Sequence, residues 1–355
     1  MALRRMDPGD MNEALKRIAK KAAYFSGVLP IQHALEHRDT LTAVMFHRVL
    51  DRDDPRWNDA NPRDTVSTEF FADCLRFFHR HYDVVALEDV IRSTKGGARL
   101  PSRGLLITFD DGWSDNLRYA APVLRAQGLP AVVFVTVDAV ASRDAEWWQE
   151  RVYAAYRTGA MTPERHAALD AAATAAVRPG AWVQRPDEPS VLSLIARLGT
   201  LDAARRAPLI ADLPPREQGT RMMLTPAELA ALRQAGVELG VHGFSHAPLT
   251  MLADPGDDLA LAREGLRSMA GGISSLDALA YPHGRYDAGV QAAAERVGFT
   301  AIFTSDEHIN RLKPGGVANA RSIGRIVIDQ QLLSDERGRL RSEEMATWLF
   351  RRPLQ

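Results

Sequence analysis

The chain has 355 residues, of which 46% are apolar and 25% charged, and its formal net charge is −1. This composition is typical of a globular protein, and the length leaves room for one large α/β domain with additions or for two domains. The near-zero net charge argues against nucleic-acid binding through bulk electrostatics. Cys74 is the only cysteine, and no bilayer-spanning apolar run or signal-peptide pattern is present, so we expect a cytoplasmic protein without an intrachain disulfide.

Residues 1–40 are predicted to form a helical segment, because apolar residues recur at helical spacing and basic residues occupy the other side of the same helix. The apolar positions are Met11, Leu15, Ile18 and Ala22, and the polar ones are Glu13, Lys16, Arg17, Lys20 and Lys21. One interpretation is peripheral contact with the inner face of an anionic membrane. The other, favoured because few large anchoring residues are present, is a surface helix packed on the body of the protein.

Residues 41–328 are predicted to form a parallel α/β fold, because apolar strands alternate with amphipathic helices. A helix capped by Ser67 or Thr68 presents an apolar face that includes Cys74, and another helix over 118–127 ends at Gly128. A helical insertion interrupts the pattern at about 142–221, and 329–355 is predicted to be a helical tail. The expected strands are 41–49, 84–87, 105–109, 131–137, 237–241, 276–281, 300–304 and 323–328.

Two adjacent carboxylates, Asp110 and Asp111, follow directly after the apolar strand that begins at Leu105, and Gly112 allows a sharp turn after them. The twist of a strand end can bring both acids to one site, where they repel each other and lose hydration. A metal ion is the usual compensation when histidines are available elsewhere in the chain. This stretch is therefore predicted to be the centre of the functional site.

A second strand, 237–241, runs directly into His242, and His246 follows four positions later. A turn between them can direct both imidazoles toward one point, which suits two ligands of one divalent ion. Parallel strands present their carboxyl ends on one common face, so these histidines are predicted to meet Asp111 there. Two histidines and one carboxylate leave positions for water and substrate, which is typical of a catalytic site.

Three segments, Thr108–Gly112, His242–His246 and Tyr281–Gly284, resemble successive motifs of the polysaccharide deacetylase (NodB-homology) family. The resemblance covers roughly residues 41–328 apart from the insertion. It implies a distorted (β/α)7-type barrel, a divalent metal, most often Zn²⁺, and hydrolysis of an N-acetyl group on a sugar. It also implies a glycan or a lipid-linked sugar as the substrate, with no nucleic-acid partner, whereas the oligomeric state is left open.

The resemblance also suggests roles for individual residues. Asp111, His242 and His246 resemble the metal ligands of the family, and Asp110 resembles the catalytic base. A backbone N–H near His283 is expected to stabilise the oxyanion. The whole set assigned to substrate and oxyanion binding is Tyr281, Pro282, His283 and Arg325.

This chain departs from the family pattern at two points. A C-terminal Leu-x-His motif, which supplies the general acid in many members, is absent after Ile323, so His47 on the first strand is our candidate acid and His308 its rival. The arginine that often stands two residues before the motif proline is Ala280 here, and Arg325 is the suggested substitute.

Several alternatives stay open at this stage. The same site could hydrolyse another non-peptide C–N bond, such as a formamide, or the chain could be a non-catalytic carbohydrate-binding relative. Trp147 and Trp148 could stack on a sugar ring or could pack the insertion onto the barrel. The histidines outside the motifs are expected to face solvent, and these are His33, His37, His79, His81 and His166.

Overall fold

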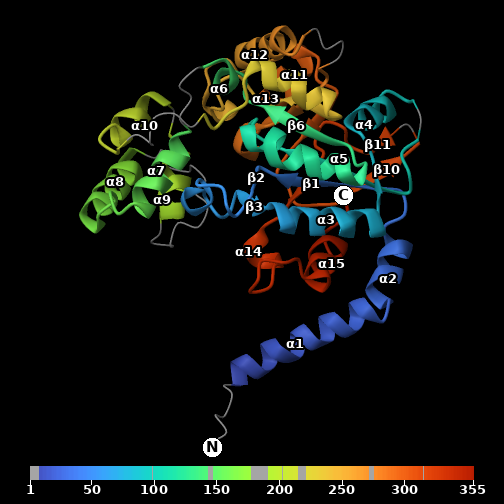
Figure 1. Cartoon of the computed structure of the whole chain (residues 1–355). Helices are drawn as coiled ribbons and strands as arrows, with labels where there is room; N and C mark the ends of the chain where they lie inside the picture. The colour runs from blue at the N-terminus through green and yellow to red at the C-terminus, as the bar shows by residue number, and fades with distance from the viewer. Residues whose placement is uncertain are drawn as a thin grey trace, which may run out of the picture.

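The computed structural model describes the segments 8–97, 99–142, 147–176, 191–201, 203–214, 221–271, 276–314 and 316–355. Figure 1 shows a curled sheet surrounded by helices, a lobe of helices to one side and a long N-terminal helix that extends away from the body. Within the described residues, no helix is both long enough and apolar enough to cross a membrane.

The central sheet is built from parallel strands that curl into a barrel. In spatial order they are β1 (Thr40–Phe46), β5 (Arg103–Phe109), β6 (Ala131–Val135), β7 (Val237–Val241), β8 (Ala278–Ala280) and β9 (Ala301–Phe303). Strand β12 (Arg325–Val327) pairs with the free side of β1, and a bridge between Phe303 and Ile323 joins β9 to the segment before β12. The predicted distorted barrel is therefore confirmed.

Alternation along the strands divides the core into two layers. Leu105, Ile107 and Phe109 of β5 join the outer cluster, which also contains Phe71 and Leu124 from the covering helices. The intervening side chains belong to a separate inner cluster that includes Leu106, Val132, Phe134 and Phe303. Burial on both faces explains why these strands read as continuous apolar runs in the sequence.

The helices that cover the outer face begin and end where the sequence signals predict. In α3 (Thr68–His81) the Ser67 hydroxyl accepts a hydrogen bond from the Phe70 N–H at 3.2 Å, and α5 (Ala121–Gln127) ends at Gly128 with φ +65°. A π-helical turn over Asn116–Ala120 precedes α5. The remaining barrel helices are α4 (Leu87–Thr94), α6 (Val137–Ala141), α11 (Pro226–Gln234), α12 (Pro255–Met269) and α13 (Ala288–Val297).

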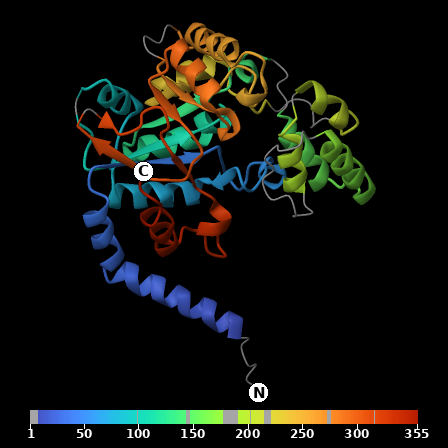
Figure 2. The same ribbon diagram turned by 180° about the vertical axis from the view of Figure 1, so that it is seen from behind.

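Four helices of the insertion surround a hydrophobic core of their own and form the lobe beside the barrel (Figures 1 and 2). They are α7 (Trp148–Arg157), α8 (Pro163–Ala176), α9 (Val191–Leu198) and α10 (Ala203–Ile210). The part of the predicted insertion at 177–190, like the shorter gaps at 143–146 and 215–220, lies outside the described residues.

The first predicted strand is wrong in extent, because the chain breaks at His47. Strand β1 ends at Phe46, and β2 (Arg48–Leu50) leaves the barrel to pair with β3 (Thr65–Ser67) in a separate two-stranded sheet. The strand expected at 84–87 is reduced to β4 (Asp83–Val84). The sequence analysis also missed β10 (Asn310–Lys313) and β11 (Gly316–Val317), which extend the sheet in antiparallel fashion beside β1.

The N-terminal helices and the helices of the C-terminal tail pack together beside the barrel. The N-terminal segment contains two helices, α1 (Pro8–Phe25) and α2 (Val28–Glu36), separated at Gly27 with φ +85°. The C-terminal tail contains α14 (Gln330–Leu333) and α15 (Ser342–Phe350). Lys20 on α1 forms an ion pair with Glu344 on α15 at 2.7 Å.

Three of the histidines expected to face solvent are buried, and that expectation is wrong for them. His33 is 1% exposed, stacks on Phe350 with ring centroids 3.8 Å apart, and lies 2.8 Å from His37 through their Nδ1 atoms. His81 contacts the Tyr24 hydroxyl at 2.9 Å. Burial lowers the pKa of His33 to about 3 and that of His81 to about 4, and it also lowers the pKa of His37. These imidazoles are therefore neutral at pH 7.

These buried histidines predict a loss of stability in mild acid. Because their folded-state pKa lies below the unfolded value of about 6.5, the unfolded chain binds more protons as the pH falls, so stability decreases below that pH. Replacing His33 by Leu should reduce the difference in unfolding free energy between pH 7 and pH 5 by up to about 2 kcal/mol. Denaturant titrations at both pH values measure this difference. The same substitution at the exposed His79 should leave it unchanged, and an unaltered difference in the His33 variant would contradict the prediction.

Candidate metal centre and active site

The two aspartates lie at the carboxyl end of β5, as expected. The Asp110 N–H donates to the Phe46 carbonyl oxygen at 3.1 Å, which continues the strand pairing by one residue, and the Thr136 N–H donates to the Asp111 carbonyl oxygen at 3.1 Å. Asp111 and Gly112 both have positive φ, +76° and +91°. The chain therefore turns sharply at Asp111, so that its carboxylate and that of Asp110 reach the same region.

The two histidines lie on the loop that follows β7. The His242 imidazole is held at Nδ1, 2.8 Å from the Ala280 carbonyl oxygen, so Nδ1 carries the proton and Nε2 has a free lone pair. Asp258 on α12 holds the loop between the histidines by accepting hydrogen bonds from the Phe244 N–H at 2.8 Å and the Ser245 hydroxyl at 2.7 Å. Asp258 was not predicted, because its sequence position in the first turn of α12 gives no sign of this contact.

Asp111, His242 and His246 bring three potential ligand atoms together. Asp111 Oδ1 lies 3.5 Å from His242 Nε2 and 3.2 Å from His246 Nε2, and all three ligand atoms lie within 4.8 Å of one another. Within the described residues this is the one group of three or more such side chains that could hold a metal ion. The donor set and the fixed His242 tautomer fit a divalent cation such as Zn²⁺.

Backbone strain is concentrated at this site. Among the described residues, four that are not glycine have positive φ: Asp39, Asp111, His246 and His283. Three of these four belong to the site. A left-handed conformation costs a non-glycine residue about 1 kcal/mol or more, and such residues gather where a side chain must be aimed at a functional position.

Charges and burial at the site favour an ionised Asp111 beside a neutral His242. Burial alone would raise the pKa of Asp111, but the histidines beside it, His246 first, hold that pKa well below its usual range. Burial lowers the pKa of His242 to about 4 against the opposing effect of Asp110. At neutral pH, His242 is therefore in the unprotonated form that a metal ligand requires.

Arg325 contacts Asp110 in a bidentate ion pair, with distances of 2.6 Å from Nη1 to Oδ1 and 2.8 Å from Nη2 to Oδ2. Its side chain is fully buried. Although burial raises the pKa of Asp110, the charge and hydrogen bonds of Arg325, together with the charges of His242 and His47, keep that pKa below its usual value. Arg325 is the first residue of β12.

His47 lies directly after β1 and is half-buried. Its carbonyl oxygen accepts a hydrogen bond from the Asn116 side-chain amide at 2.9 Å. Burial favours the neutral imidazole, but the charges of Asp64, Asp111 and Asp110 raise the pKa of His47 above its usual value. The rival candidate, His308, is buried against Gly324. Burial lowers the pKa of His308 below its usual value, against the opposing charge of Asp306.

The Tyr-Pro-His-Gly segment packs beside the site, and its expected role in substrate and oxyanion binding stays a prediction. Tyr281 is fully buried, stacks on Tyr286 and donates its N–H to the Phe303 carbonyl oxygen at 3.1 Å. Pro282 is also buried, beneath the loop between the two histidines. His283 lies closer to the predicted ligands, with its Nε2 3.1 Å from the His246 carbonyl oxygen and the two rings 4.4 Å apart.

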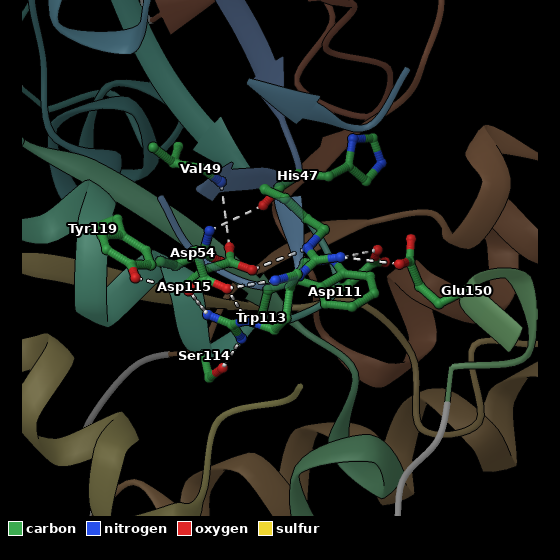
Figure 3. A network of polar contacts seen from close by, with 12 residues as sticks. His47, Val49, Asp54, Asp111, Trp113, Ser114, Asp115, Tyr119 and Glu150 are labelled. Atoms are coloured by element: carbon green, nitrogen blue, oxygen red, sulfur yellow. Dashed lines mark hydrogen bonds and ion pairs between the residues drawn. The ribbon is translucent and has the colours of Figure 1, made fainter. Parts of the chain in front are cut away.

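A buried network that the sequence analysis did not predict holds Asp111 from the other side (Figure 3). Trp113 Nε1–H donates to Asp111 Oδ2 at 3.0 Å, and the Arg48 guanidinium lies 4.4 Å from the centre of a Trp113 ring. Arg48 in turn donates to Asp115 at 2.9 Å and to Glu150 at 3.0 Å. Glu150 belongs to α7, so the insertion is connected to a predicted metal ligand through three side chains.

The two tryptophans at the start of α7 have different environments. Trp147 lies at the site, with its ring 4.6 Å from that of His246 and 5.6 Å from that of Trp113. Trp148 packs within the insertion, where the Arg206 guanidinium lies 4.3 Å from its ring. Of the pair, Trp147 is therefore the one positioned to contact a ligand.

Comparison with protein families agrees with this geometry. The family model described as polysaccharide deacetylase matches residues 97–302, more than half of the chain. The chain therefore belongs to the polysaccharide deacetylase family. The matched range contains Asp110, Asp111, His242 and His246 but ends before Arg325 and begins after His47.

Solved structures show the same fold. The deacetylase PplD of Streptococcus pyogenes, in complex with acetate, aligns with a TM-score of 0.55 and 16% identity over 88% of this chain and 99% of its own. IcaB from Ammonifex degensii aligns with a TM-score of 0.54 and 18% identity over 88% of this chain and 97% of its own. A comparison with curated proteins finds no match.

The loop that carries the two histidines should not tolerate a side chain at Gly243. This residue has φ +73°, and a Cβ there would lie 3.0 Å from Pro282 Cγ and 3.2 Å from Asp258 Oδ1. Gly243→Ala should therefore displace the loop and lower zinc affinity about tenfold or more, as measured by isothermal titration calorimetry. Gly236→Ala is the matched control, because Gly236 has φ +87° with no atom within 4 Å of the added Cβ. Equal zinc affinity in the two variants would show that the contacts at Gly243 do not position the ligands.

The hydrogen bond from Trp113 should position Asp111 and so strengthen its binding of a metal ion. Trp113→Phe keeps an aromatic ring beside Arg48 but removes the N–H donor, so zinc affinity should fall about tenfold to a hundredfold with little change in the thermal unfolding midpoint. Trp147→Phe is the control, since Trp147 contacts His246 through its ring. Zinc affinity unaffected in the Trp113 variant would rule out this role.

Proposed function

We propose that this protein is a metal-dependent hydrolase that removes the N-acetyl group from an N-acetylhexosamine in a polysaccharide or a glycolipid precursor. The observation that carries the proposal is the convergence of Asp111, His242 and His246 beside an ionised Asp110. Membership of the polysaccharide deacetylase family supports a carbohydrate deacetylase, while the metal and the particular sugar belong to the proposal.

The three converging side chains would hold the metal ion. Zn²⁺ suits them, because two imidazole nitrogens and one carboxylate oxygen are ligands that it favours when further positions are left for water and substrate. When bound, such an ion supplies a Lewis acid for the acetyl carbonyl and a water nucleophile at neutral pH.

Asp110 acts as the general base. Its Oδ2 lies 3.9 Å from His242 Nε2, so this carboxylate is beside the ligand set rather than within it. Arg325 fixes the orientation of both carboxylate oxygens and keeps them ionised. As water adds to the amide carbon, Asp110 accepts one of its protons.

His47 acts as the general acid. The amine leaves as the C–N bond breaks, and its nitrogen needs a proton at that moment. The nearby carboxylates favour the imidazolium form of His47, which supplies such a proton near neutral pH. The products are then acetate and the free amino sugar, so the atoms of the amide and of one water molecule are all accounted for.

Trp147 offers a surface for the sugar. Its ring is half-buried and contacts that of His246, so it lies at the edge of the ligand set. Aromatic faces suit the apolar side of a pyranose ring. Stacking there would bring the sugar beside the predicted metal ligand His246.

The roles of base and ligand predict two distinct defects. Asp110→Asn should lower the rate of acetate release from N-acetylglucosamine oligomers by about 10²-fold to 10⁴-fold while leaving zinc affinity largely intact. His242→Ala should abolish both. Acetate assays, zinc titration and thermal unfolding on each variant separate these effects, and the last is needed because Asp110→Asn leaves the buried Arg325 without its carboxylate. Loss of zinc binding in the Asp110 variant together with retention in the His242 variant would overturn the assignments.

The wild-type protein tests the function itself. We expect tight zinc binding together with zinc-dependent acetate release from a glycan. Zinc binding without acetate from any glycan would point to a different C–N bond as the substrate. Absence of zinc binding would contradict a metal-dependent enzyme.

A further inference from the structure

An apolar face on the N-terminal helices has no partner within the described residues. Nine large apolar side chains are exposed in the described part of the chain, and six of them lie within 21 positions of α1 and α2. Their exposures range from 58% to 72%. We call them the N-terminal apolar face, which consists of Leu15, Ile18, Phe25, Val28, Ile31 and Leu35.

This face points away from the barrel. In α1 the side that meets the body contains Tyr24, which is 6% exposed, and Lys20, which pairs with Glu344. At 100° per residue, Leu15, Ile18 and Phe25 lie on the side of the helix away from Tyr24 and Lys20. Figures 1 and 2 show that the first part of α1 extends beyond the body, so the barrel leaves this face uncovered.

The charges on the stretch that carries the face are basic, and the acidic Glu13 and Glu36 lie just outside it. Between Ala14 and Leu35 the sequence contains four basic residues and no acidic one. Arg17 and Lys21 lie on the flank of the apolar stripe, and Lys21 Nζ is 3.9 Å from Glu343 with its side chain 61% exposed. The surface is therefore an apolar stripe bordered by cations.

The charge pattern selects among possible partners. A second copy of the chain would bring the same basic flank against this one, with no acidic residue between Ala14 and Leu35 to pair with it. A bilayer that contains anionic lipids offers apolar acyl chains to the stripe and negative headgroups to the flank.

We propose that α1 and α2 form a peripheral docking surface for an anionic lipid bilayer. The helices lie along the interface, with the N-terminal apolar face among the acyl chains and Arg17 and Lys21 against the headgroups. The exposed apolar side chains of α1 run from Leu15 to Phe25, a span of about 15 Å or three turns in contact with the lipid. This proposal rests on exposure and charge alone and is independent of the reaction at the metal centre.

Vesicle flotation of the full-length protein tests the proposal. The protein should float with vesicles of 70% phosphatidylcholine and 30% phosphatidylglycerol, and should bind vesicles of pure phosphatidylcholine at least tenfold more weakly. Replacing Arg17 and Lys21 by Glu should reduce binding to the anionic vesicles by at least 25-fold, since removing each cation costs roughly fivefold. The triple variant Ile18→Glu, Phe25→Glu, Ile31→Glu should remain in the soluble fraction.

Matched controls come from exposed apolar residues elsewhere. Leu261→Glu and Tyr156→Glu change side chains that are 58% and 51% exposed, and they should float like the wild type. Circular dichroism of the triple variant should match that of the wild type, which would show that the variant is folded. Wild-type protein that stays soluble with anionic vesicles would overturn the proposal, as would equal loss of flotation in the control variants. A dimer that the triple variant abolishes, without vesicle binding by the wild type, would assign the face to a second copy instead.

Discussion

Two adjacent carboxylates buried at the end of one strand impose the central constraint on this structure. Asp110 and Asp111 are 3% and 5% exposed, so each needs a compensating charge. Arg325 compensates Asp110 through both oxygens. The ligand histidine His242 is held neutral by burial, so the negative charge of Asp111 is left for a cation that the two imidazoles also bind. The uncompensated charge of Asp111 therefore favours a bound cation, as do the positions of the three ligand atoms.

The same constraint explains the local backbone. Directing three side chains from two strand ends into one small volume requires sharp turns, and Asp111 and His246 adopt left-handed conformations to achieve them. Surrounding contacts hold these turns in place. Asp258 accepts three hydrogen bonds from the loop between the histidines, and the Thr136 N–H holds the Asp111 carbonyl. The strained conformations therefore persist because well-ordered elements on either side fix the loops that contain them.

The sequence was sufficient for what depends on local pattern. The barrel strands, the caps of α3 and α5 and the meeting of Asp111 with His242 all follow from periodicity and from the common direction of parallel strands. The sequence was insufficient where a contact with a residue far away along the chain determines the environment of a side chain. Arg48 looked like part of a strand, yet its buried charge is satisfied by Glu150, about a hundred positions away. His33 lies in a helical stretch and was expected to face solvent, whereas the tail residue Phe350 covers it.

The insertion illustrates how an addition to a barrel can become part of its site. Glu150 is 2% exposed, and burying a carboxylate to this degree is unfavourable unless a cation meets it. That cation is Arg48, which lies in β2 at the end of the first barrel strand and packs on Trp113. The insertion therefore docks through the side chain that supports Trp113, and Trp113 holds Asp111. A shift of α7 would leave Arg48 with Asp115 alone and would move Trp147 away from His246. The ion pair between Glu150 and Arg48 therefore attaches the insertion and, through Trp113, also helps to position the predicted metal ligand Asp111.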